Sequence, residues 1–139
     1  MHADESRLRS AARRGLAVPG VAFIGLGLAW IVAPVTASPS LGMDLLDGVG
    51  RTSQIADLAS FFLTLGTSTL LALRLDRRAS YVPSMLLVSF AAFGRIIAWA
   101  VHGGALTADA IAVEVVMATW LGAIAFTTAG RLPSLSNQA

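Results

Sequence analysis

The chain of 139 residues is short, strongly apolar and weakly charged. Hydrophobic residues make up 55% of it and charged residues 13%, with a formal net charge of +2 and a mean hydropathy of +0.72. Soluble domains contain about 25% charged residues, so this composition predicts a single-domain integral membrane protein. The chain contains no cysteine, which excludes disulfides, thiolate catalysis and Cys-ligated metal. We expect no nucleic-acid partner, because no basic face with interleaved aromatic residues is present.

Residues 1–14 are polar and rich in arginine. We interpret them as a basic cytoplasmic anchor, either a short interfacial helix or an unstructured segment, that contacts anionic lipid headgroups. The apolar run from about 15 to 37 is long enough, at about 1.5 Å per residue, to cross a bilayer core of about 30 Å. Pro19 lies in its first turn, where a missing N–H is tolerated. A signal peptide is the competing interpretation, but we expect this segment to be retained as a span.

Residues 38–53 read as a loop, and the second apolar run covers 54–73. The polar residues of this run recur at i, i+3, i+7 and i+11: Asp57, Ser60, Thr64 and Ser68. This spacing places them on one helical face. We therefore expect one side of the helix to contact protein or water and the other to contact lipid.

The third run covers about 82–102 and the fourth about 107–129, followed by a polar tail at 130–139. Seven of the ten basic residues precede run one or lie between runs two and three. The positive-inside rule then places both termini in the cytoplasm. The prediction is an all-α bundle of four transmembrane helices forming one domain over 15–129. Small residues four apart, such as Gly25, Ala29 and Ala33, predict close helix packing, which could extend to a homo-oligomer.

An arginine lies inside the third run. A charge deep in a bilayer costs from about 2.5 to well over 10 kcal/mol, so it almost always faces a partner or a wet cavity. Counting from the outer helix ends at 1.5 Å per residue places Arg95 and Glu114 about 10 Å deep, and Asp57 about 5 Å deep. The three residues are thus expected in one outer-leaflet layer. Trp99 and His102 share a helical face with Arg95.

Two hypotheses explain this cluster. In the first, it is a structural clip, with Arg95 bridging the two carboxylates and holding three helices in register. In the second, it is a polar pocket that opens outward. The catalytic candidates are then Asp57, Glu114, Arg95 and His102. Four further residues are candidate ligand-binding positions: Trp99, Ser60, Thr64 and Gln54. We expect no metal or other cofactor, because no second histidine is placed to join His102 and the arginine would repel a cation.

Three functions remain open at this point. The chain could bind or transform a small lipophilic molecule by acid/base chemistry, such as isomerisation, epoxide opening or cyclisation. The alternative is an accessory or structural subunit of a larger membrane complex, with the cluster as a buried ion-pair clip. A further alternative is a small transporter, which would need to be oligomeric, because four helices are few for transport. In each case the expected partners include membrane lipids.

The chain resembles a family of small four-helix bacterial membrane proteins of unknown function, loosely DoxX-like, over about 20–128. The resemblance is carried by five short features: Gly-Leu-Ala-Trp-Ile-Val-Ala-Pro at 27–34, Asp57 followed by small residues to Gly66, Gly94-Arg95, Gly103 and Glu114. The family often has an arginine just before the helix-two acid, whereas here Gln54-Ile55-Ala56 precedes it. The resemblance implies a four-helix fold in the bacterial cytoplasmic (inner) membrane and draws attention to the charged cluster. It implies no established activity.

Overall fold

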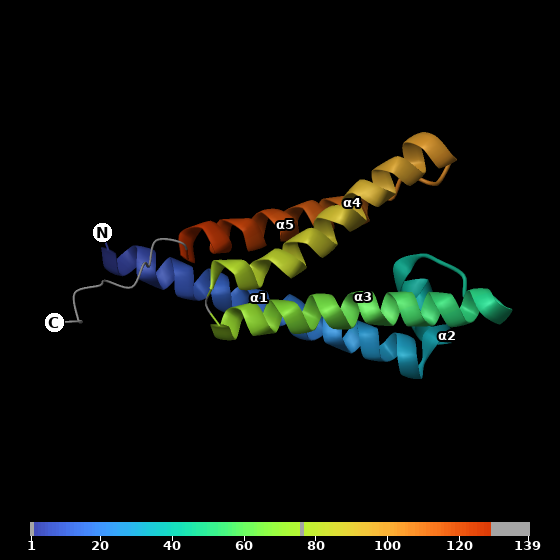
Figure 1. Ribbon diagram of the computed structural model, residues 1–139, viewed down its shortest axis with the longest axis horizontal. Coiled ribbons are helices and arrows are strands. Elements are labelled where there is room, and N and C mark those ends of the chain that lie inside the picture. Colours follow the sequence, from blue (N-terminus) through green and yellow to red (C-terminus); the bar gives the residue numbers. More distant parts are fainter. Residues whose placement is uncertain (1, 76, 129–139) are drawn as a thin grey trace. The chain divides into compact units, whose positions relative to one another are not determined.

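A computed structural model describes residues 2–75 and 77–128; the predicted tail at 130–139 lies outside these residues. All regular structure in the described part is helical, which confirms the all-α class (Figure 1). The α-helices are α1 (His2–Val32), α2 (Pro34–Ala37), α3 (Gly48–Leu75), α4 (Val82–His102) and α5 (Ala108–Thr128). Two short 3-10 helices, η1 and η2, cover Ser38–Leu41 and Arg78–Tyr81.

Four helical stretches are long and apolar enough to cross a membrane, which fits a multi-pass membrane protein. They are Ser10–Val32, Gly48–Leu75, Arg78–His102 and Ala108–Thr127. No more than 28% of the residues in the most apolar window of each stretch are buried inside the protein. Large apolar side chains such as Val32 and Phe126 are exposed on the protein surface. Such an apolar exterior is what lipid tails would solvate.

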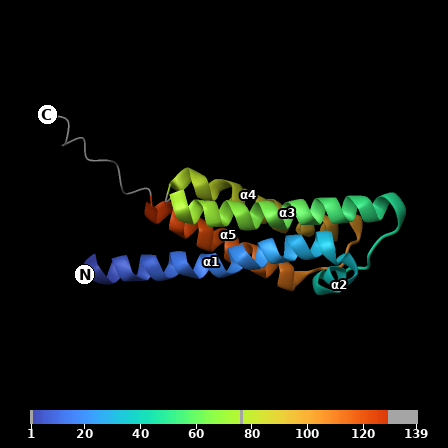
Figure 2. The ribbon, with the colours of Figure 1, turned by 90° about the horizontal axis from the view of Figure 1, so that it is seen from below.

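The chain forms two compact units, Met1–Arg74 and Leu75–Ala139, and each is described by itself. In the first unit, α1 and α3 run antiparallel and side by side (Figure 2). Their backbones approach closely at glycines. A Cβ added to Gly66 would lie 2.6 Å from the carbonyl oxygen of Gly20, and one added to Gly27 would lie 2.9 Å from the backbone nitrogen of Leu63. Only residues without a side chain permit this separation.

Of the predicted small-residue stripe, Ala29 packs against the core that includes Ala59 and Phe62 of α3, but Gly25 is not at this contact. A Cβ added to Gly25 would meet nothing within 4 Å, whereas Gly20, Gly27 and Gly66 are buried. Spacing of four identifies positions on one face, but several faces of α1 carry small residues. The glycines that matter are those opposed by small residues or backbone on α3.

The core of the first unit forms around the end of α1. Trp30 is fully buried and packs with Ala37, Ala59 and Phe62. The ring of Phe23 stacks on that of Phe62, with centroids 6.1 Å apart. The helix breaks after Val32, and Pro34 restarts it as α2, because proline fits the first turn of a helix but not its interior. The break folds Ala37 back onto Trp30.

Two boundaries differ from the prediction. Residues 2–14 form the first turns of α1, so this helix begins earlier than the predicted span and Pro19 lies inside it rather than in its first turn. The role of these residues as a basic anchor stays a prediction. Alanine and arginine favour helix, which explains the extension. The predicted loop at 38–53 is also partly helical, because η1 occupies Ser38–Leu41 and α3 begins at Gly48.

In the second unit, α4 and α5 form an antiparallel hairpin (Figure 1). The turn begins at Gly103, whose φ of 67° is a left-handed conformation that glycine adopts without strain. Buried residues recur every four positions on α4, at Ser84, Val88 and Ala92. At the opposite end, the guanidinium of Arg78 lies 4.6 Å from the centre of the Phe126 ring, which attaches η2 to α5.

Candidate functional site

Arg95 and Glu114 pair across the α4–α5 hairpin. The Nε of Arg95 donates a hydrogen bond to Oε1 of Glu114 at 2.9 Å. The Glu114 side chain is 12% exposed, and that of Arg95 is 38% exposed. The arginine therefore keeps one side open while the carboxylate is mostly enclosed by protein.

The pair leaves hydrogen-bonding capacity unused. Oε2 of Glu114 is buried and has no hydrogen-bond partner among the described residues. Over the same residues, Arg95 engages the carboxylate through Nε alone and not through the bidentate fork that its terminal nitrogens allow. A buried acceptor without a partner costs about 1–3 kcal/mol, and more when it is charged. Such an atom calls for an explanation, and a catalytic role, backbone strain, or a bound water or ion can supply one.

An apolar groove of about 500 Å³ lies along the same hairpin. Two of the residues that line it are direct sequence neighbours of the ion pair: Ile96 follows Arg95, and Val115 follows Glu114. Trp99 lines the groove and is 50% exposed. The full lining comes from both helices and their connection: Ile96, Trp99, Leu106, Ala108, Ile111, Ala112, Val115 and Val116. The hairpin thus combines a charged pair with an apolar surface large enough for a small molecule.

Most of this lining escaped the sequence analysis. The residues on α5 form a pattern that was available, because Ala108, Ala112 and Val116 are four apart and Ile111 and Val115 are also four apart. In an apolar span, however, every face is apolar, and periodicity does not separate a groove from a lipid-facing surface. Leu106 lies in the connection between α4 and α5, where a helical period cannot predict which way a side chain faces.

Asp57, Ser60 and Thr64 belong to α3 in the first unit, and all three are exposed. At 100° per residue they lie on a different side of α3 from Ala59, Leu63 and Gly66, which pack against α1. These three residues are therefore not on the face of α3 that packs against α1. The expectation that Asp57 lies level with the Arg95–Glu114 pair and completes a three-helix layer stays a prediction.

Gln54 has a role that the sequence analysis did not foresee. Its Oε1 accepts a hydrogen bond from the backbone N–H of Leu46 at 2.9 Å, and its Nε2 donates to the carbonyl of Asp44 at 3.0 Å. Arg51 supports the same turn by donating from Nε to the carbonyl of Leu46 at 2.8 Å. The Gln54 side chain thus holds the segment before α3. Whether Gln54 also contacts a ligand stays a prediction.

His102 is the last residue of α4, directly before Gly103. Its side chain is exposed, in keeping with a position at the end of the hairpin. Among the described residues, no group of three or more His, Cys, Asp or Glu side chains is placed so that it could hold a metal ion. A role for His102 at the mouth of a pocket stays a prediction.

Comparisons with known proteins do not extend this picture. No protein-family model matches the chain, and no curated protein or solved structure matches it. The resemblance to DoxX-like proteins therefore stays a prediction.

Proposed function

We propose that the protein binds a small lipophilic molecule along the α4–α5 hairpin and holds its polar end at the Arg95–Glu114 pair. The observation that carries this proposal is the buried Oε2 of Glu114, which has no hydrogen-bond partner among the described residues. The apolar groove on the same hairpin supports it, since Trp99 and its neighbours offer the surface that an apolar body requires.

The unused atoms define the chemistry of the polar end. Oε2 of Glu114 accepts hydrogen bonds, and the terminal nitrogens of Arg95 donate them. A group that both donates and accepts, such as a hydroxyl or a carboxylic acid, would satisfy both partners at once. A pure hydrocarbon would leave Oε2 buried and unpaired. The ligand class is therefore a lipophilic alcohol or acid.

We extend the proposal to acid/base chemistry on the bound ligand. Glu114 would transfer a proton at the polar end, while Arg95 stabilises the charge that develops there. The extended proposal keeps the predicted roles of two further residues: Asp57 would be the second acid/base group, and His102 would lie at the mouth. Isomerisation, epoxide opening and cyclisation are the reaction classes that such a set performs without a cofactor.

The membrane setting belongs to the same proposal. The protein resides in the bacterial cytoplasmic membrane with both termini inside, because arginines gather in the amino-terminal segment and between α3 and α4. The Arg95–Glu114 pair would then lie in the outer leaflet, and a lipophilic ligand would enter from the bilayer.

A structural role is the second candidate, and the direct 2.9 Å contact between Arg95 and Glu114 favours it. In that case the pair is a clip that holds α4 against α5, and the protein acts as an accessory subunit of a larger membrane complex. A clip requires the ion pair but has no use for the adjacent groove.

Tryptophan quenching separates the two roles. The probes are a long-chain alcohol brominated along its chain and the matching brominated alkane, added to the detergent-purified full-length protein. A ligand site predicts that the alcohol quenches Trp99 more than the alkane does. The variant Trp99→Phe should lose this difference, because Trp30 and Trp120 would supply only background.

The variant Glu114→Gln should abolish the preference for the alcohol while the protein stays helical by circular dichroism. Asp109→Asn is the matched control, because Asp109 is an exposed acid in the first turn of the same helix. Equal quenching by alcohol and alkane in the wild-type protein would overturn the ligand role and leave the clip.

A further inference from the structure

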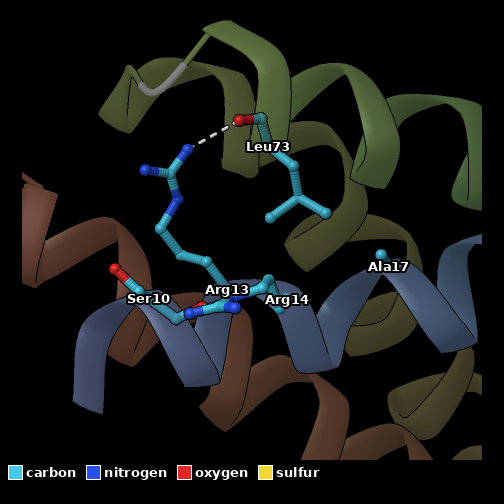
Figure 3. Close-up of a pocket in the computed structure, with 5 residues that line it drawn as sticks. All are labelled: Ser10, Arg13, Arg14, Ala17 and Leu73. Carbon is cyan, nitrogen blue, oxygen red and sulfur yellow. Dashed lines mark hydrogen bonds between the residues drawn. The ribbon is translucent and has the colours of Figure 1, made fainter. Parts of the chain in front are cut away.

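The first unit has a pocket at each end of the antiparallel α1–α3 pair. At the amino-terminal end of α1, Arg13 donates from Nη2 to the carbonyl of Leu73 at 2.6 Å and joins the two helices (Figure 3). The pocket at the other end has a volume of about 470 Å³ and lies in the connection between α1 and α3. Its lining comes from α2, η1 and the segment that follows them: Val35, Ser38, Pro39, Gly42, Met43, Asp44 and Leu45.

Contacts with α1 and α3 hold the walls of this connection pocket. Met43 and Leu45 pack against the core around Trp30, which is fully buried. From α3, Nε2 of Gln54 donates to the carbonyl of Asp44 at 3.0 Å and to the sulfur of Met43 at 3.3 Å. A ligand would therefore meet walls that are already ordered, which lowers the entropy lost on binding.

The polar groups at the connection pocket can all accept hydrogen bonds. Pro39 has no N–H, so the carbonyl of Val35 lacks the donor that a helix normally supplies four residues later. Ser38 is 4% exposed, so its hydroxyl needs a partner in the protein or in the pocket. Asp44 is exposed and contributes a carboxylate. A cation that donates several hydrogen bonds fits such a set of acceptors.

The charge of the connection between α1 and α3 is negative. Over residues 33–53 the charged side chains are Asp44, Asp47 and Arg51, so two negative charges and one positive charge leave one negative charge in excess. Arg51 is already engaged, because it pairs with Asp47 at 2.9 Å and donates to the carbonyl of Leu46 at 2.8 Å. No ion pair engages Asp44 over residues 2–75 and 77–128. Its carboxylate is therefore available to a cation.

The place of the pocket along the helices selects the form of that cation. The candidate span of α1 ends at Val32, and that of α3 begins at Gly48. In a bilayer the connection pocket would therefore lie at the level of the lipid headgroups. A primary ammonium has three N–H donors, as in lysine, whereas the quaternary ammonium of a choline headgroup has none. Met43 and Leu45 add apolar surface on which the first part of an acyl chain can rest.

We propose that Asp44, Ser38 and the carbonyl of Val35 form a binding site for the primary ammonium group of a phosphatidylethanolamine headgroup. This site is separate from the α4–α5 hairpin and does not depend on the function proposed for it. A free alkylammonium ion has the same recognition chemistry and is distinguished by competition.

Native mass spectrometry of the full-length protein tests the site. The protein is released from mixed micelles that contain equal amounts of phosphatidylethanolamine and phosphatidylcholine with identical acyl chains. Both lipids carry the same phosphate and no net charge, so the N–H donors and the size of the ammonium group distinguish them. The wild-type protein should retain phosphatidylethanolamine in preference.

Two substitutions remove acceptors from the site. Asp44→Asn removes the charge from an exposed side chain and should lower the preference about fivefold. Ser38→Ala should lower it about threefold, because one neutral hydrogen bond is lost. The double variant should lose nearly all of the preference, and circular dichroism checks that each variant stays helical.

Asp47→Asn is the matched control for charge. It removes the same charge from the same connection, but Asp47 pairs with Arg51 and does not line the pocket. This variant should therefore keep the preference of the wild-type protein. An equal loss in Asp47→Asn and Asp44→Asn would overturn the proposal, because the effect would then reflect net charge alone.

Addition of ethylammonium chloride distinguishes the two sources of the ligand. If ethylammonium leaves the retained lipid unchanged, the site is specific for the lipid; if it displaces phosphatidylethanolamine, the site takes primary ammonium groups in general. Equal retention of the two lipids by the wild-type protein would overturn the proposal. The same preference in the wild-type protein and in helical Asp44→Asn would also overturn it.

Discussion

Arg95 holds Glu114 by a single hydrogen bond from Nε to Oε1, at 2.9 Å, while the second carboxylate oxygen is buried without a partner among the described residues. Arg95 therefore does not form the bidentate arrangement, in which two guanidinium nitrogens each donate to one carboxylate oxygen. A pair whose only task is to join α4 to α5 would gain from the second contact. An open carboxylate oxygen and open guanidinium nitrogens are better suited to a third partner.

The strength of this pair is the first prediction. We expect a double-mutant cycle with Arg95→Gln and Glu114→Gln to give a coupling energy of about 1 kcal/mol, because the arginine is more than a third exposed and partly screened. Thermal unfolding of the four proteins in one detergent measures it. A coupling near zero would mean that the contact does not stabilise the hairpin.

Gly66 sets the separation of α1 and α3, so Gly66→Ala should destabilise the protein. The new methyl group would lie 2.6 Å from the backbone oxygen of Gly20, which cannot move without its helix. We expect a loss of about 2 kcal/mol in the free energy of unfolding. Gly25→Ala is the matched control: that site is open and alanine favours helix, so the substitution should leave stability unchanged or raise it by up to about 1 kcal/mol. Equal effects at the two positions would contradict the observed contact.

Gln54→Ala should loosen the segment before α3. The substitution removes the hydrogen bonds to the N–H of Leu46 and the carbonyl of Asp44, which together contribute about 1–2 kcal/mol, and the weaker bond that Nε2 donates to the sulfur of Met43. Amide hydrogen exchange should accelerate at Leu46 while the centre of α3 keeps its protection. Thr52→Ala, at an exposed neighbouring position, should leave exchange at Leu46 unchanged. Unchanged exchange in Gln54→Ala would show that the amide does not hold the turn.

The orientation in the membrane can be tested directly because the chain has no cysteine. Leu106→Cys places a thiol in the exposed α4–α5 connection, and Ala79→Cys places one at the exposed connection before α4. With both termini in the cytoplasm, a membrane-impermeant maleimide should label Leu106→Cys in intact cells and Ala79→Cys only after lysis. The reverse pattern would invert the proposed topology.

The sequence by itself determined the all-α class and the four long apolar helices. Length and apolarity are local properties, and every backbone group in an apolar span must find its partner within the helix. Because length and apolarity can be read directly from the sequence, the predicted span 82–102 coincides with α4. The pairing of Arg95 with Glu114 across the hairpin also follows from counting residues along two helices that are joined at a glycine turn.

The tertiary structure alone decided which side chains these helices bring together. Gly25 and Gly66 both occur in apolar helices with small neighbours, yet only Gly66 lies where another backbone approaches. In the sequence, Gln54 is a polar residue at the start of a span. In the structure, its partners include backbone groups eight and ten residues earlier. Periodicity identifies a face of a helix. What that face contacts depends on rotation, register and approach, which arise only when helices pack.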